Sequence, residues 1–201
     1  MKVGVTGASG LLGTAFSEHS HKNIDWVCIP GPSNNGPNFL DREQAFDYFN
    51  EQKFDAVVHA AAKVGGIKSN INNAYDFFTE NIRINTNVLD AAYNSETKRC
   101  ISFLSTCIYP DDTTYPLLEE NIHKGEPHPS NSSYAYAKRM LDVQSQSISK
   151  LKGYNYTCVV PNNLYGINDN FDLENSHVIP GIISKVKVAL DSNKKTVKLW
   201  G

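Results

Sequence analysis

Short runs of apolar residues alternate along the chain with longer stretches in which apolar residues recur every three or four positions. The short runs are typical of buried strands, and the longer period is typical of amphipathic helices. The expected strands are Lys2 to Thr6, Asp25 to Ile29, Ala56 to His59, Cys100 to Ser105 and Tyr156 to Val160. The expected helices are Leu11 to Ser20, Arg42 to Gln52, Tyr75 to Tyr93, Tyr134 to Ser149 and Ile179 to Leu190. Because strands and helices alternate, we expect an α/β protein with a doubly wound parallel sheet covered by helices on both faces.

Three segments break this alternation. Gly31 to Asn38 combines glycines and prolines with asparagines, which predicts a surface loop after the second strand. Pro110 to Ser132 is a longer loop, and its length predicts that it covers a site or is partly mobile. Thr196 to Trp200 has the pattern of a new strand that stops at Gly201, so we expect further sequence to follow it.

The composition changes this picture little but excludes several classes of function. A chain of 201 residues with 40% hydrophobic content can bury one core. A net charge of -2 and 19 scattered basic residues give no positive field for a nucleic-acid partner. The spacing of the four cysteines predicts reduced thiols and no metal site. No apolar run approaches the roughly 18 residues of a membrane span, so we expect a soluble, cytoplasmic protein with no membrane partner.

Three glycines follow the first expected strand and open the first expected helix, in the sequence Gly7-Ala8-Ser9-Gly10-Leu11-Leu12-Gly13. Glycine lets the backbone turn sharply and approach a pyrophosphate, whose charge then meets unpaired N–H groups at the positive end of a helix. The alternative is a turn that only packs the helix on the strand. The position between a strand and a helix favours dinucleotide binding. The candidate cofactor-binding residues of this loop are Gly7, Ser9, Gly10, Leu11, Leu12 and Gly13.

The end of the second expected strand bears on the choice of dinucleotide. An Asp or Glu at this place binds the ribose 2′-hydroxyl of NAD, but here Ile29 is followed by Pro30-Gly31-Pro32. NADP is therefore favoured by elimination, although the usual Arg or Lys for its 2′-phosphate is missing as well. Asp41, a further candidate cofactor residue, could approach the adenine, or it could equally cap the helix that begins near Arg42.

Tyr134 and Lys138 are four residues apart on one expected helix, so their side chains point to one face. This helix follows the strand that ends at Ser105, and ligands bind at the carboxyl edge of an open parallel sheet. An ammonium roughly 4 Å from the phenol, at an effective dielectric of about 20, would favour the phenolate by about 4 kcal/mol, or nearly three pKa units. Tyr134 would then exchange a proton, and Ser105 would hydrogen-bond a substrate oxygen that gains charge during hydride transfer. The alternatives are a core tyrosine, a surface lysine and a strand-end serine.

Six segments carry a more specific pattern. They are His59-Ala60-Ala61-Ala62-Lys63-Val64-Gly65-Gly66, Leu104-Ser105-Thr106-Cys107-Ile108-Tyr109-Pro110, Tyr134-Ala135-Tyr136-Ala137-Lys138-Arg139-Met140, Pro161-Asn162-Asn163-Leu164-Tyr165-Gly166, Asp169-Asn170-Phe171 and His177-Val178-Ile179-Pro180. With them the chain resembles the extended short-chain dehydrogenase/reductases, and within these the GDP-L-fucose synthase family, over essentially its whole length. The first, second and last segments are specific to that family, whereas the glycine loop and Tyr-x-x-x-Lys belong to the wider superfamily.

The resemblance implies the 3,5-epimerisation and 4-reduction of a GDP-sugar, GDP-4-keto-6-deoxymannose, with NADP(H) as cofactor. Cys107 and His177 match the family's base and acid, and thiol and imidazole groups have ordinary pKa values of about 8.5 and 6.5, close to neutrality. Lys185 and Trp200 match residues that touch the GDP-sugar. The family also implies a homodimer through the helices Tyr75 to Tyr93 and Tyr134 to Ser149. The further cofactor positions that it implies are Ala60, Ala61, Leu104, Ser105, Tyr134, Lys138, Pro161, Asn162, Asn163, Leu164 and His177.

Other interpretations stay open. Without the resemblance, Cys107 reads as a small buried hydrophobe and His177 as a residue at the N-terminus of a helix. Members of the family continue past the Trp200-Gly201 element into a smaller domain that completes the sugar-nucleotide pocket. We therefore expect residues 1 to 201 to be an NADP-binding domain, with 177 to 201 the beginning of the substrate-binding portion. The alternatives are another NAD(P)-dependent sugar-nucleotide epimerase, dehydratase or reductase, or a non-catalytic NADP-binding module.

Overall fold

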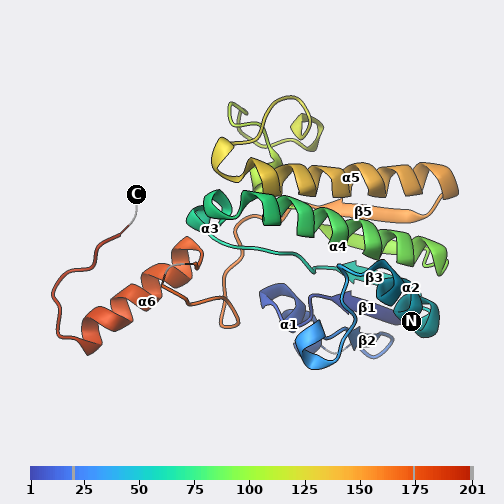
Figure 1. Ribbon diagram of the computed structural model, residues 1–201, viewed down its shortest axis with the longest axis horizontal. Coiled ribbons are helices and arrows are strands. Elements are labelled where there is room, and N and C mark those ends of the chain that lie inside the picture. The colour runs from blue at the N-terminus through green and yellow to red at the C-terminus, as the bar shows by residue number, and fades with distance from the viewer. Residues whose placement is uncertain (20, 174, 200–201) are drawn as a thin grey trace.

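Five parallel strands form one sheet at the centre of the molecule. The computed structural model describes residues 1–19, 21–173 and 175–199. The strands lie in the order β2-β1-β3-β4-β5, and all neighbours pair in parallel (Figure 1). Their bounds are β1 Lys2–Thr6, β2 Asp25–Cys28, β3 Ala56–His59, β4 Arg99–Phe103 and β5 Asn155–Val159. The direction of travel across the sheet reverses between β1 and β3, so the strand order places a topological switch point there.

The helices confirm most of the predicted pattern. They are α1 Leu11–Glu18, α2 Arg42–Gln52, α3 Ile67–Asn72, α4 Ala74–Asn94, α5 Ser132–Lys152 and α6 Val178–Asp191. Short 3₁₀ turns form η1 Pro32–Asn34, η2 Thr106–Ile108, η3 Glu119–Asn121 and η4 Pro129–Asn131. The short α3 was not predicted. The strand expected from Thr196 is wrong, because residues 196–199 form no strand, and Trp200 lies outside the described residues.

The two faces of the sheet are covered unequally. On one face, α2, α4 and α5 bury the main core, in which Phe49, Leu89 and Leu141 are almost fully enclosed. On the other face, α1 covers a smaller cluster in which Val3, Val5 and Val58 pack against partly buried aromatic side chains. Beyond α1 this second face is open, and Ile101 on β4 is 44% exposed. No described helix is both long enough and apolar enough to cross a bilayer.

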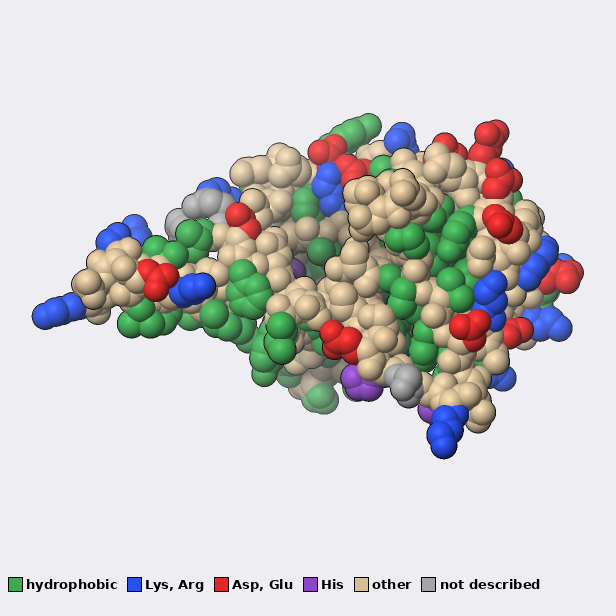
Figure 2. Space-filling model, turned by 90° about the horizontal axis from the view of Figure 1, so that it is seen from below, with side chains coloured by type: hydrophobic (Ala, Val, Ile, Leu, Met, Phe, Trp, Pro, Cys, Tyr) green, Lys and Arg blue, Asp and Glu red, His purple; other side chains and the backbone are tan. Residues whose placement is uncertain are grey.

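The last helix, α6, does not lie on the sheet. It extends away from the strands at the left of Figure 1, beyond the end of α3. Figure 2 shows hydrophobic side chains gathered along this projection. On α6, the residues Val178, Ile183 and Leu190 are more than half exposed. The apolar period that predicted this helix is therefore correct, but the described part of the chain buries only Pro180 and Ala189 among the apolar residues of α6.

The long loop between β4 and α5 is held by contacts within itself and with α5. Pro110 and Pro127 form an isolated antiparallel bridge, and the Asp111 backbone N–H donates to the Glu126 carbonyl oxygen at 2.9 Å. His123 Nε2 lies 3.0 Å from an Asp142 carboxylate oxygen on α5. The loop therefore folds back on itself and rests on the helix that carries Tyr134 and Lys138.

Candidate functional site

The glycine loop lies at the switch point, and two of its glycines are required by close backbone contacts. Gly7 has φ +68°, and a Cβ atom added to it would lie 2.7 Å from the Ala61 backbone nitrogen. A Cβ atom on Gly13 would lie 2.2 Å from the Gly7 carbonyl oxygen. Any side chain at either position would push α1 or β3 away, so both glycines hold the loop tight between the two strands.

Gly10 has a different role, because the space around it is open. A Cβ atom there would meet only the Gly7 carbonyl oxygen, at 3.4 Å. Gly10 is the N-cap of α1 and supplies no side-chain hydrogen bond to the first turn, whose residues include Leu11 and Leu12. Backbone N–H groups at a helix N-terminus, beside exposed Ser9 and Gly10, form a donor set that suits an anionic pyrophosphate. The residues present therefore fit a dinucleotide at this loop.

A buried hydrogen-bond network connects this loop to α5. The Thr6 hydroxyl lies 2.9 Å from His59 Nδ1, and it accepts from the Ala61 backbone N–H at 3.1 Å. His59 Nε2 lies 3.1 Å from Asn85 Oδ1, and Asn85 Nδ2 donates to the Ala137 carbonyl oxygen at 3.3 Å. Burial lowers the pKa of His59 to about 3, so the imidazole is neutral and its Nε2 carries the proton that Asn85 accepts. The network links the ends of β1 and β3 to α4 and α5.

Four predicted catalytic residues come together where β4 ends. Ser105 precedes η2, and its hydroxyl accepts from the Cys107 backbone N–H at 3.5 Å. Lys138 on α5 is only 2% exposed, and its Nζ lies 5.8 Å from the centroid of the Tyr134 ring. The Tyr134 ring packs edge-on against Phe77 of α4. The strand end, the η2 turn and α5 thus place a serine, a thiol, a phenol and an ammonium in one group.

Lys138 does not lower the pKa of Tyr134, contrary to the sequence-based expectation. Burial raises the pKa of Tyr134 above its usual 10, and a charged Cys107 would raise it further. The Lys138 Nζ donates instead to the Phe103 carbonyl oxygen at 2.8 Å, and burial lowers its own pKa to about 8. The expectation was wrong because it counted the attraction between the charges and left out the cost of removing a phenolate from water.

The Cys107 thiol is subject to opposing effects. Burial raises its pKa, whereas the Ser105 hydroxyl and the charges of Lys138 and Arg139 act to lower it, and burial wins. Cys107, Cys28, Cys100 and Cys158 are all free thiols. Among the residues that the structure describes, no group of three or more His, Cys, Asp and Glu side chains is placed to hold a metal ion.

The remaining predicted cofactor residues line the same edge of the sheet or lie just beyond it. Ala60 and Ala61 follow β3 against Gly7, and the buried Leu104 follows β4. After β5 the chain passes through a half-buried proline and three exposed residues, Pro161, Asn162, Asn163 and Leu164. Asp41 caps α2, since its Oδ1 accepts from the backbone N–H groups of Glu43 and Gln44. The capping interpretation of Asp41 is therefore correct, and its contact with adenine stays a prediction.

The predicted epimerisation acid, His177, and the predicted sugar contact Lys185 lie at the start of α6 and on that helix. His177 is the exposed N-cap of α6, and the neighbouring Asn175 carbonyl oxygen accepts from the Gly66 backbone N–H at 3.3 Å. Lys185 is half-buried on α6 and lines a cavity of about 270 Å³ between that helix and the segment that follows it. Trp200 lies outside the described residues. The backbone contact of Asn175 therefore places His177 near the Gly65-Gly66 pair, while Lys185 lines a separate cavity.

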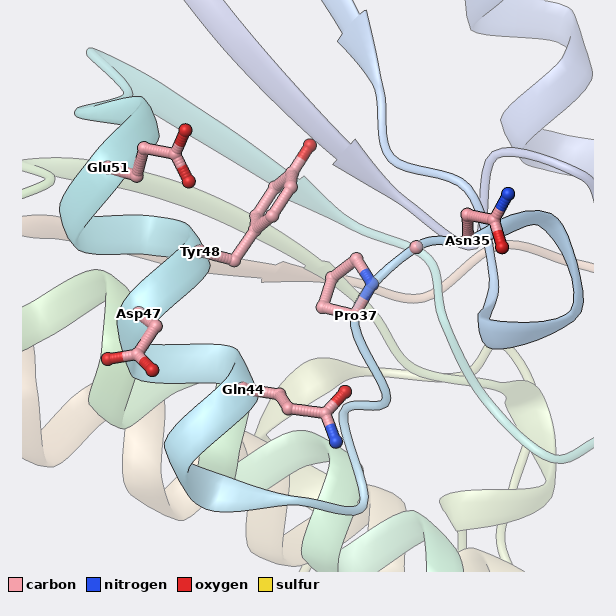
Figure 3. A pocket seen from close by; sticks show the side chains of 7 residues that line it. Asn35, Pro37, Gln44, Asp47, Tyr48 and Glu51 are labelled. Carbon is pink, nitrogen blue, oxygen red and sulfur yellow. The ribbon is translucent and has the colours of Figure 1, made fainter.

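A pocket of about 310 Å³ lies between α2 and the loop that follows β2 (Figure 3). The side chains of Gln44, Tyr48 and Glu51 line this pocket from α2, and Pro37 lies opposite them. Its seven lining residues include two carboxylates and no cation, so it does not supply the charge that an adenosine 2′-phosphate needs. They are Asn35, Gly36, Pro37, Gln44, Asp47, Tyr48 and Glu51.

The sequence analysis missed the polar residues that support the site. Asn81 on α4 binds both backbone groups of Lys63, accepting from its N–H at 2.9 Å and donating to its carbonyl oxygen at 3.0 Å. Asn85 belongs to the network with His59, and both asparagines are buried. Asparagine is a poor helix former, so two of them four residues apart within one expected helix were a signal for buried hydrogen bonding.

Together the switch point and the glycine loop define a dinucleotide-binding type of α/β fold, and Ser105, Tyr134 and Lys138 are grouped at the same edge of its sheet. The comparison with protein families makes this specific. Residues 3–201 match the NAD dependent epimerase/dehydratase family, and the chain belongs to it.

Individual proteins of known name are also similar to the chain. The chain is 43% identical over 194 residues to a GDP-L-fucose synthase of Dictyostelium discoideum, covering 94% of this chain and 60% of that protein. It is 35% identical to a GDP-L-colitose synthase of Yersinia pseudotuberculosis, covering all of this chain and 65% of that one. A crystal structure of a GDP-L-fucose synthetase from Naegleria fowleri bound to NADP superposes with a TM-score of 0.88 at 36% identity, over all of this chain and 65% of that one. The chain thus spans less than two thirds of the length of these relatives.

Proposed function

We propose that this protein catalyses the NADPH-dependent 3,5-epimerisation and 4-reduction of GDP-4-keto-6-deoxymannose. The observation that carries the proposal is the grouping of Cys107 with Ser105, Tyr134 and Lys138, because a thiol beside a hydride-transfer group suits both reactions. The GDP-L-fucose synthases of Dictyostelium and Naegleria, the second bound to NADP, support the choice of sugar and cofactor.

The reduction needs a proton donor as well as a hydride. NADPH, when bound, supplies the hydride to the carbonyl carbon. Tyr134 donates its phenolic proton to the carbonyl oxygen as that oxygen gains charge, and Ser105 stabilises the same oxygen with a hydrogen bond. Because burial raises the pKa of Tyr134, the phenol holds its proton at neutral pH, and the protonated form is the one that reduction requires. Lys138 holds the end of β4 through the Phe103 carbonyl oxygen.

The epimerisation uses the acidity of the carbons on either side of the ketone. Cys107, as the thiolate, removes a proton from carbon 3 or 5, and the electron pair delocalises into the enolate oxygen. Ser105 and Tyr134 stabilise that oxygen, and His177 returns a proton to the opposite face of the carbon. Burial opposes the thiolate, whereas Ser105, Lys138 and Arg139 favour it, so the surroundings of Cys107 decide how much of the active form exists.

The remaining parts of the proposal concern the assembly. We assign residues 1–201 to an NADP-binding domain, with 177–201 the beginning of a substrate-binding portion, and the position of α6 away from the sheet supports this assignment. A homodimer through α4 and α5 is supported by side chains that these helices leave exposed, Tyr75 and Phe78 on α4 and Met140 and Val143 on α5. Four free thiols support a cytoplasmic location.

A GDP-L-colitose synthase relative favours one alternative, which is action on a different GDP-linked 4-keto sugar. The test combines binding with turnover. Calorimetry should show NADPH binding more tightly than NADH, and absorbance should show NADPH oxidation when GDP-4-keto-6-deoxymannose is added. Oxidation only with another 4-keto sugar nucleotide would contradict the proposed substrate. Tight NADPH binding without any oxidation would show a non-catalytic NADP-binding module and overturn the proposal.

A further inference from the structure

Arg139 is a buried cation whose described hydrogen-bond partners are backbone carbonyl groups, and its guanidinium carbon lies 5.4 Å from the centroid of the Tyr136 ring. It follows Lys138 on α5 and is only 4% exposed. Its Nε donates to the Ile108 carbonyl oxygen at 2.7 Å, and its Nη1 donates to the Gly125 carbonyl oxygen at 2.7 Å. Its Nη2 is buried and has no hydrogen-bond partner in the described structure. Burying a guanidinium is costly, so a position that keeps one needs a specific reason.

The reason is visible in what the two neighbouring cations hold. Lys138 Nζ binds the carbonyl oxygen of Phe103, the last residue of β4, and Arg139 Nε binds the carbonyl oxygen of Ile108, the last residue of η2. The six residues from 103 to 108 are thereby fixed to α5 at both ends. This segment contains Ser105 and Cys107, and Tyr134 lies on the helix to which it is fixed.

Within the turn, the Ile108 backbone N–H donates to the Ser105 carbonyl oxygen at 3.1 Å and the Tyr109 N–H donates to the Thr106 carbonyl oxygen at 3.3 Å, but neither bond joins the turn to α5. The Cys107 backbone N–H reaches the Ser105 hydroxyl only at 3.5 Å, the long limit for such a bond. Through Nη1 and the Gly125 carbonyl oxygen, Arg139 also binds the second half of the loop between Pro110 and Asn131 to α5. A planar guanidinium can donate in two fixed directions at once, and a lysine ammonium cannot reproduce that geometry from the same position.

We propose that Arg139 is a positioning residue for Cys107: with Lys138 it clamps the 103–108 segment to α5 and so fixes the thiol beside Ser105 and Tyr134. The charge of Arg139 also acts on the thiol, because it favours the thiolate against the effect of burial. The role of Cys107 in epimerisation rests on the proposed function, whereas the clamp itself does not. A test based on thiol reactivity therefore separates the two.

The experiment follows alkylation of Cys107 by iodoacetamide against pH, with each cysteine resolved by peptide mass spectrometry. Arg139→Met removes the fork and the charge, so its Cys107 profile should move to higher pH and the alkylation rate at neutral pH should fall. Arg139→Lys keeps the charge and loses the fork. Its midpoint should stay near that of the wild type, while the limiting rate at high pH rises because the turn is loosened.

Two controls keep the result interpretable. Arg42→Met removes an exposed arginine from α2 and should leave the Cys107 profile unchanged, and the half-buried Cys28 serves as an internal reference in every sample. If Arg139→Met does not fold, Arg139→Lys alone decides through its limiting rate. Wild-type Cys107 profiles in both folded variants, or a wild-type limiting rate in Arg139→Lys, would overturn the clamp. Either result is independent of whether the protein oxidises NADPH.

Discussion

The strand-end group, which we define as His59, Ser105, Cys107, Tyr134, Lys138 and Arg139, differs sharply from the segments 161–173 and 175–199 in how its side chains are held. In the strand-end group, Lys138, Arg139 and His59 are all less than 5% exposed, and each donates to or accepts from a named partner. In the second segment His177 is exposed, and so are most apolar side chains of α6. The side chains proposed for hydride transfer are thus held by buried contacts, whereas the proposed acid His177 is exposed.

The difference follows from the cost of burying polar groups. A buried ammonium, guanidinium or imidazole must keep its partners, because losing one exposes a desolvation cost of about 1 to 3 kcal/mol or more. The position of each side chain in the strand-end group is therefore coupled to the fold. The exposed His177 at the N-terminus of α6 has water as an alternative partner, so its geometry is set by fewer contacts. Rigid positioning is what proton and hydride transfer require.

The largest expected effect comes from removing the proton donor of the strand-end group. Tyr134→Phe should reduce the rate of NADPH oxidation by about a hundredfold to ten-thousandfold, because the buried phenol is the protonated acid of the reduction. NADPH binding, followed by its fluorescence, should change little. Tyr154→Phe, just before β5 and at the opposite end of the strands, is the matched control. Equal activity of the two variants would contradict the assignment of Tyr134.

Much of the fold was predictable because its signals are local. The period of apolar residues predicted α2 with its observed bounds, and it predicted β1 and β3 to the residue. The six-residue α3 was missed because it is too short for a periodic pattern to stand out. For α6 the periodicity predicted the helix but carried no information about which surface buries its apolar side.

The candidate site was predictable only where residue spacing carries the information. Tyr134 and Lys138 lie four apart on one helix, and their side chains meet as that spacing requires. Thr6, His59 and Asn85 come from three elements and are far apart in the sequence, so no local pattern predicts their contact. Arg139 resembles any surface arginine until the fold places two carbonyl oxygens at its fork.

An intermediate effect is expected from the neutral His59, through the dependence of stability on pH. The folded-state pKa of about 3 lies below the usual 6.5, so the unfolded chain takes up a proton that the folded protein refuses. The stability contributed by this group is present above pH 6.5 and is lost as the pH falls toward 3. The wild type should therefore lose about 2 kcal/mol between pH 6.5 and 5 from this residue, as measured by urea unfolding.

The variant His59→Gln tests that attribution. It should be less stable at pH 7 because the bonds to Thr6 and Asn85 are not both kept, yet its stability should fall less steeply below pH 6.5. His21→Gln removes an exposed histidine and should give a curve parallel to the wild type. A His59→Gln curve that also runs parallel would show that another group is responsible for the acid sensitivity.

The smallest expected effect comes from the exposed apolar surface of α6, and it tests whether this helix is held more loosely than the strand-end group. Ile183 is 52% exposed, so Ile183→Ala should change the free energy of unfolding by no more than about 0.5 kcal/mol. Leu141 on α5 is 1% exposed, and Leu141→Ala, the matched loss from a buried position, should cost about 2 to 5 kcal/mol through the cavity that it leaves. Urea unfolding at two protein concentrations measures both. A cost for Ile183→Ala close to that of Leu141→Ala would show that α6 is covered in solution, and a cost that grows with protein concentration would identify a second copy as the cover. Either outcome would mean that α6 is held as firmly as the strand-end group.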